Sequence, residues 1–210
     1  MLRAMMRQAF GVKSYSMYDD PTDIGMKPEV GRHVGHEPLG MSFRDFYFRE
    51  LGSPRLTLIK THEKPSDSSL AIYIVRDGRS AIVSWYNMLR RAKNRTDISM
   101  TDIILGQKVP FGDWSSHIKA WNPRHNPRVL LLRYQDLVSH PAPALELISD
   151  FIGKRQIAPW RDNFGKLNQL YPQFFAGGSD ERNIGQLANG EKELFWRVHG
   201  QTMREFEFAA

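Results

Sequence analysis

One segment of this 210-residue chain limits its possible folds more than any other, because a buried strand runs directly into a turn and a helix. The strand is LAIYIVR at 70–76, a nearly continuous apolar run typical of a parallel strand covered on both faces. Asp77 and Gly78 then mark a turn, and residues 79–93 have the composition of a helix. This order predicts the α/β class.

Buried strands and helices alternate along the rest of the chain. Further strands are expected at 56–61 and 128–134, and the Asp-, Pro- and Gly-containing stretch 19–40 is expected to be mostly loop. This alternation predicts a parallel sheet flanked by helices in three layers, within a single domain spanning residues 1–210. Helices are expected at 2–10, 41–52, 79–93, 114–122, 141–153, 159–170 and 190–207.

The chain is basic, with a formal net charge of +6 and a pI of about 9.6. A basic balance favours anionic partners such as nucleotides or sulfated compounds, but the scattered cations argue against nucleic acid. With no cysteine, disulfides and thiolate metal sites are excluded. His33 and His36 are spaced like metal ligands but have no evident third ligand, so no metal is expected. We find no membrane span and no signal peptide, and expect a cytoplasmic location.

Two polar residues at 70–91 are candidates for phosphate binding. Arg76 stands where the strand ends, and Ser84 follows eight residues later in the helix. In open parallel sheets, ligands bind at the carboxyl ends of strands, where an arginine can clasp a phosphate and a serine can add a donor. The alternative is structural: Arg76 pairs with Asp77 or Asp67, and Ser84 faces the sheet.

The segment YIVRDGRSAIVSWY (73–86) resembles the part of sulfotransferases dependent on 3′-phosphoadenosine 5′-phosphosulfate (PAPS) that grips the cofactor's 3′-phosphate. Arg76 and Ser84 match that family in type and spacing. Further segments agree with it in order, which implies the P-loop-NTPase-like sulfotransferase fold. They are IKTH (59–62), FGDWSSHIKAW (111–121), LLLRYQDLVSHPAPALELISDFIG (130–153) and FWRVHGQTMREFEF (195–208).

The resemblance also implies roles for individual residues. His62, in the match to the family's Lys-Thr-His, would be the general base, and Lys60 would stabilise developing negative charge. The two side chains should point to the same face of the strand, because they are two residues apart. Tyr134 would lie near the nucleotide, or simply pack at the rim of the core. His117 would be structural or line the acceptor pocket.

Two departures from the family pattern stand out. The first strand and its 5′-phosphosulfate loop are not recognisable, so the fold is expected to be N-terminally incomplete and the chain poorly stable or inactive. In FFAGGSDERN (174–183), Ala176 and Gly177 stand where the family has two cations. Gly178 keeps its place and could offer a backbone N–H, and Arg182 could supply charge. We therefore expect weak cofactor binding.

The function predicted from the sequence is transfer of a sulfuryl group from PAPS to a hydroxyl or amine. A nucleotide-binding phosphotransferase on a related scaffold is one alternative, but no magnesium ligands or Gly-x-x-x-x-Gly-Lys-Ser/Thr loop are recognisable. A non-catalytic remnant or binding protein with this fold is another. The acceptor is an unidentified small molecule, glycan or lipid, and the oligomeric state stays open.

Overall fold

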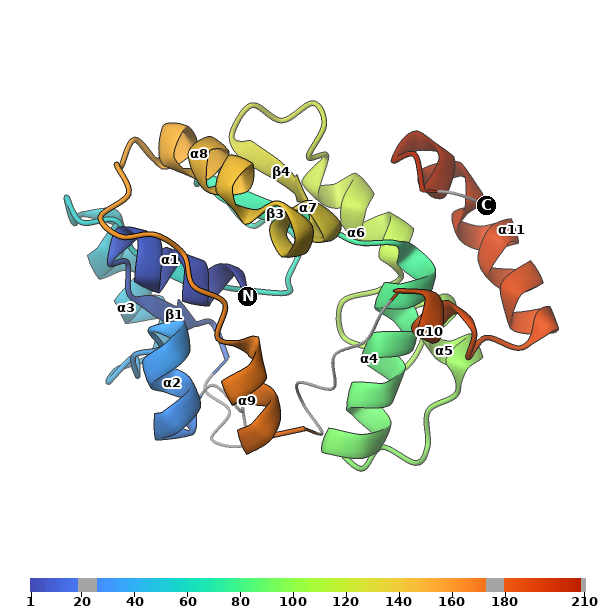
Figure 1. Ribbon diagram of the computed structural model, residues 1–210. Coiled ribbons are helices and arrows are strands. Elements are labelled where there is room, and N and C mark those ends of the chain that lie inside the picture. The colour runs from blue at the N-terminus through green and yellow to red at the C-terminus, as the bar shows by residue number, and fades with distance from the viewer. Residues whose placement is uncertain (19–25, 173–179, 209–210) are drawn as a thin grey trace. The chain divides into compact units, whose positions relative to one another are not determined.

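The strands of this protein pair in parallel, and the described ones form two sheets of two strands each. The computed structural model describes residues 1–18, 26–172 and 180–208 (Figure 1). Its contacts divide the chain into two compact units, Met1–His62 with Asp136–Leu170, and Glu63–Gln135 with Tyr171–Ala210. Parallel strands interspersed with helices confirm the α/β prediction. A single domain over residues 1–210 stays a prediction.

The first unit contains the sheet of β1 (Ser14–Ser16) and β2 (Leu58–Lys60), in a register that places Ser16 opposite Lys60. The sequence did not predict β1, because it is short and two of its three residues are serine. Ser14 can be buried in this strand because its hydroxyl donates a hydrogen bond to the carbonyl of Val34 at 2.9 Å. The helices of this unit are α1 (Leu2–Phe10), α2 (Pro28–Val34), α3 (Phe43–Leu51), α8 (Pro141–Ile152) and α9 (Phe164–Leu170).

Helix α2 lies inside the stretch that was expected to be mostly loop. It begins with Pro28 in its first turn and ends at Gly35, whose φ of 62° lies in the left-handed region. A β-carbon on Gly35 would meet the aliphatic stem of Arg7, so this position needs glycine for space as well as conformation. The helix is only seven residues long, which is too short for a clear helical period of apolar residues to indicate it in the sequence.

The second unit contains β3 (Ala71–Val75), paired in parallel with β4 (Val129–Arg133) along all five residues. Figure 1 shows α4 (Gly78–Ala92) leaving β3 directly, as predicted, and Asp77 caps it by accepting the backbone N–H of Arg79 at 2.9 Å. The other helices of this unit are α5 (Met100–Ile104), α6 (Trp114–Trp121), α10 (Asp180–Ile184) and α11 (Asn189–Glu205); α7 (Tyr134–Ser139) spans the boundary between units.

The core of the second unit is apolar and joins β3 to its helices. It includes Val75 from β3, Val83 from α4 and Phe195 from α11, all buried. Trp85 and Tyr86 are partly buried and pack against it. Because Val75, the last residue of β3, is packed in this core, the core holds the backbone next to Arg76 in place. Within the described residues, no helix has both the length and the apolar character needed to cross a membrane.

Candidate functional site

Arg76 follows the last residue of β3 and carries its charge into a polar cluster of the second unit. Its Nε and a terminal nitrogen lie 2.7 and 2.6 Å from Oδ1 of Asp180, the first residue of α10. The guanidinium carbon lies 4.5 Å from the centroid of the Tyr134 ring. Arg76 is thus held by a charge-assisted pair and a cation–π contact.

Two further donors converge on the Asp180 carboxylate. The side-chain amide of Gln135 donates to Oδ2, and the Ser80 hydroxyl hydrogen-bonds to the same carboxylate. Burial alone would raise the pKa of Asp180, but the hydrogen bonds from Ser80 and Arg76 and the charge of Arg76 hold that pKa below its usual value. Ser80 is itself held by Asn183, which donates to it at 3.0 Å.

The remaining residues predicted to bind the nucleotide differ in their position and exposure. Ser84 is exposed on α4, one turn beyond Ser80 and on the same helix face. Tyr134 stands directly after β4 and provides the ring beneath Arg76. Arg182 is exposed on α10. Gly178 lies outside the described residues, as do Ala176 and Gly177.

Lys60 and His62 belong to the first unit, where Lys60 ends β2. The backbone N–H of Met17 donates to the Lys60 carbonyl at 3.0 Å, which continues the pairing beyond β1. The backbone N–H of His62 donates to the Tyr18 hydroxyl at 2.7 Å. The Tyr18 ring stacks on the His62 imidazole, with centroids 5.9 Å apart, and lies 5.7 Å from Nζ of Lys60. One aromatic ring therefore touches both predicted catalytic side chains.

His117 is bonded to a partly buried tyrosine of β3. Its Nδ1 lies 2.8 Å from the Tyr73 hydroxyl, and burial raises the pKa of that hydroxyl far above its ordinary value. Trp121 packs against the same Tyr73 ring, and its indole N–H donates to the carbonyl of Glu63 at 3.0 Å. These contacts favour the structural role for His117.

The two histidines with metal-like spacing face different partners. Nδ1 of His33 lies 3.3 Å from the side-chain amide of Asn163. His36 contacts Arg3 through Nδ1 and the Met26 sulfur through Nε2. Across residues 1–18, 26–172 and 180–208, no three or more histidine, aspartate or glutamate side chains are grouped to hold a metal ion.

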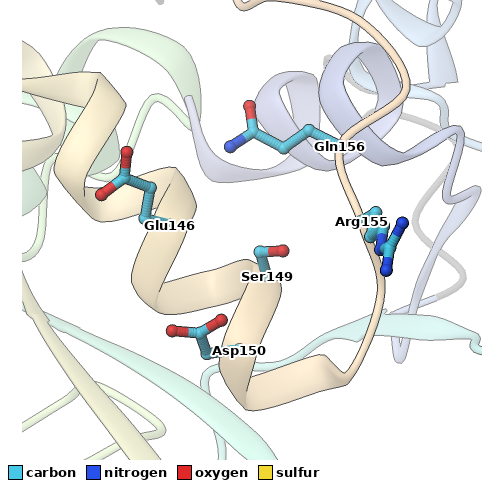
Figure 2. A pocket seen from close by; sticks show the side chains of 5 residues that line it. All are labelled: Glu146, Ser149, Asp150, Arg155 and Gln156. Carbon is cyan, nitrogen blue, oxygen red and sulfur yellow. The ribbon is translucent and has the colours of Figure 1, made fainter.

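Two surface cavities of the first unit contain none of the predicted site residues. Figure 2 shows the smaller, about 410 Å³, between the side chains of α8 and the chain that follows it. The larger, about 630 Å³, lies between α1 and α2 and is lined by Arg7, Lys27 and Arg32 among others. The residues of the smaller cavity are Glu146, Ser149, Asp150, Arg155 and Gln156.

Sequence reasoning missed four residues of these clusters. Asp180 lies in the stretch 174–183, which we singled out for its missing cations without considering its acidic residues. Ser80 and Gln135 stand beside marked positions, at 79–93 and next to Tyr134. Tyr18 had no signal of its own, because its place depends on the unpredicted pairing of β1 with β2.

The family model described as the sulfotransferase domain matches residues 47–165, which is more than half of the chain. The chain belongs to this family. Sulfotransferase 1A1 of Rattus norvegicus is 32% identical to it over 115 residues, which cover 49% of this chain and 40% of the relative. The 3-alpha-hydroxysteroid sulfotransferase of Cavia porcellus is 32% identical over 95 residues, covering 43% of this chain and 33% of the relative.

Solved sulfotransferase structures confirm the fold. The mouse sulfotransferase SULT7A1 complexed with PAP superposes with a TM-score of 0.62 at 17% identity, covering 95% of this chain and 88% of that one. Retinol dehydratase, solved with androsterone and inactive cofactor PAP, gives 0.58 at 16% identity, covering 92% and 65%. The matched segments of the sulfotransferase sequences above span at most about 40% of those proteins, while the fold itself extends over nearly the whole of this chain.

Proposed function

We propose that this sulfotransferase-family protein transfers a sulfuryl group from PAPS to a hydroxyl or amine of a small-molecule, glycan or lipid acceptor. The observation that supports this most directly is the contact between Arg76 and Asp180. At the carboxyl end of β3, the arginine already holds an oxyanion with two nitrogens. A phosphate oxygen presents the same charge and acceptor geometry to a guanidinium, so the residues present fit a nucleotide phosphate.

The nucleotide would be bound by residues of the second unit. Arg76 and Ser84 would donate to the 3′-phosphate, and Tyr134 would hold the guanidinium plane from below. Gly178 and Arg182 would add a backbone N–H and a positive charge. Arg76, Ser84, Tyr134 and Arg182 belong to one compact unit, so their part of the proposed site does not depend on how the two units are arranged.

The chemistry would be carried by the first unit. In the proposed step, the His62 imidazole removes the proton of the acceptor while the acceptor oxygen or nitrogen forms its bond to sulfur. The bond between sulfur and the bridging phosphate oxygen breaks, and 3′,5′-adenosine bisphosphate (PAP) leaves with the electron pair. The Lys60 ammonium stabilises the negative charge that develops on the bridging oxygen. A cytoplasmic location for this reaction remains a prediction.

Calorimetric titration of PAP into this chain tests the nucleotide half. We expect Arg76→Ala to weaken binding about a hundredfold, since hydrogen bonds to charged groups contribute about 1.5–3 kcal/mol each. Arg95→Ala is the matched control, because Arg95 is a partly exposed arginine of the same unit that pairs with the nearby Asp97. Equal affinity in the wild type and Arg76→Ala, or no binding to either, would overturn this half of the proposal.

Transfer of labelled sulfuryl from PAPS to a panel of phenols, alcohols and amines tests the chemistry. His62→Ala should lower kcat by about a hundredfold or more, as is usual when a general base is removed. His125→Ala, an exposed histidine of the other unit, should retain wild-type activity. Full activity without the His62 imidazole would show that another group takes the proton.

A further inference from the structure

Tyr18 owes its place beside His62 to the pairing of β1 with β2. The register sets Ser16 opposite Lys60, and Met17 extends the pairing by one hydrogen bond. Two residues beyond each of these strands, the chain reaches Tyr18 on one side and His62 on the other. Parallel pairing thus delivers an aromatic side chain to the point where the predicted catalytic strand ends.

The contacts of Tyr18 are of three different kinds. Its hydroxyl accepts the backbone N–H of His62 at 2.7 Å, which fixes the main chain at that residue. Its ring stacks on the imidazole at an interplanar angle of 19°. The Lys60 ammonium lies 5.7 Å from the ring centroid, within the range of a cation–π contact. Backbone, imidazole and ammonium are therefore all held from a single side chain.

His62 and Lys60 are polar side chains at the end of a short strand, and such side chains are difficult to hold in one orientation. His62 is exposed and Lys60 is only partly buried, so packing within a core does not select their rotamers. A stacked ring restricts the imidazole plane, and a cation–π contact restricts the end of the lysine stem. Reaction geometry is sensitive to such restraint, since a misplacement of about 1 Å can lower a rate about a hundredfold.

We propose that Tyr18 is the positioning residue for the reaction, holding the His62 imidazole and the Lys60 ammonium on one side of the sheet. The proposal rests on the sulfuryl-transfer function proposed above, but its geometric part concerns this chain alone. Tyr18 acts through its two neighbours and takes no proton in the step. The ring supplies stacking, and the hydroxyl supplies the acceptor for the His62 N–H.

Nuclear magnetic resonance of this chain separates the two contributions. Tyr18→Leu should remove the ring-current shift of the His62 imidazole protons and also move the His62 amide resonance. Tyr18→Phe should keep the ring-current shift and move only the amide, because the hydroxyl alone is lost. Tyr47→Leu is the control, since Tyr47 packs on Phe43 and Phe48 of α3. An imidazole shift that persists in Tyr18→Leu would overturn the proposal.

Kinetics supply the second readout. Tyr18→Leu should lower kcat about tenfold to a hundredfold and leave KM for PAPS within about twofold, while Tyr18→Phe recovers most of the loss. A change in KM alone, or equal kcat in all three proteins, would contradict a positioning role. A wild-type chain that transfers no sulfuryl group would refute the proposed function instead, and the resonance experiment would still decide whether Tyr18 orders His62.

Discussion

Arg76 and His62 belong to different units and are held in place by different kinds of contact. Arg76 is part of a charged cluster in which Asp180 accepts from it, from Gln135 and from Ser80. His62 is exposed and is held by a tyrosine ring and one backbone hydrogen bond. Under the proposed function, a phosphate at Arg76 would compete with the Asp180 carboxylate, whereas the His62 imidazole would need only to be kept in the right orientation.

The comparison extends to the surroundings of each residue. In the unit that contains Arg76, buried polar groups form hydrogen bonds within the core. One of them is His199, whose ring nitrogens lie 2.8 Å from the Ser115 hydroxyl and 2.9 Å from the Ile104 carbonyl. Behind His62, the first unit offers strands of only three residues. We infer that the surroundings of Arg76 are preorganised by their unit, whereas the orientation of His62 depends on local contacts.

The largest expected effect compares one glycine from each unit. Gly106 and Gly40 have φ values of +66° and +69°, so alanine is strained at both, by about 1–2 kcal/mol. A β-carbon on Gly106 would also overlap the backbone of Asp113, while one on Gly40 meets nothing within 4 Å. Urea unfolding should show a loss of about 3 kcal/mol or more for Gly106→Ala and about 1 kcal/mol for Gly40→Ala. Equal losses would contradict the close approach of the Asp113 backbone to Gly106.

The next effect concerns competition at Arg76. Asp180→Asn removes the charge of the competing carboxylate but keeps its shape, so the affinity for PAP should rise about tenfold, or about 1.4 kcal/mol. Calorimetry measures this, with Glu207→Gln as the control because Glu207 pairs with Arg133 in the same unit. Unchanged or weaker binding in Asp180→Asn would mean that the carboxylate supports the site rather than occupies it.

The sequence predicted those parts of the fold and site that depend on local signals. The strand at 70–76, the turn at Asp77 and the helix after it are adjacent in the chain, and the structure has them as β3, the α4 cap and α4. The order of motifs also predicted the family, which the family model confirms. The roles of the individual site residues stay predictions.

The missed parts depend on contacts between distant segments. Asp180 meets Arg76 across 104 positions, and Tyr18 meets His62 across 44. Neither pairing leaves a periodic or composition signal, because each follows from the packing of one element on another. Within the predicted loop, α2 lacked the length to show a helical period. The charge partner of Arg76 and the stacking partner of His62 are therefore visible only in the structure.

The smallest expected effect uses pH to separate the two units. Burial lowers the pKa of His199 against the opposing effects of its hydrogen bond to Ile104 and the charge of Asp113. Below pH 6.5 the unfolded chain binds a proton that the folded unit does not, so stability falls as the pH drops, by at most about 1.4 kcal/mol per pH unit. Amide hydrogen exchange at pH 6.5 and 5.5 should show this loss in α11 but not in α1.

His199→Gln should flatten that dependence, because glutamine can hydrogen-bond to Ser115 and Ile104 without titrating. His125→Gln, which changes an exposed histidine of the same unit, should leave the dependence in place. A parallel loss of protection in α1 would mean that the two units open together. The surroundings of Arg76 and of His62 would then share one stability, and their difference would be confined to the local contacts of these two residues.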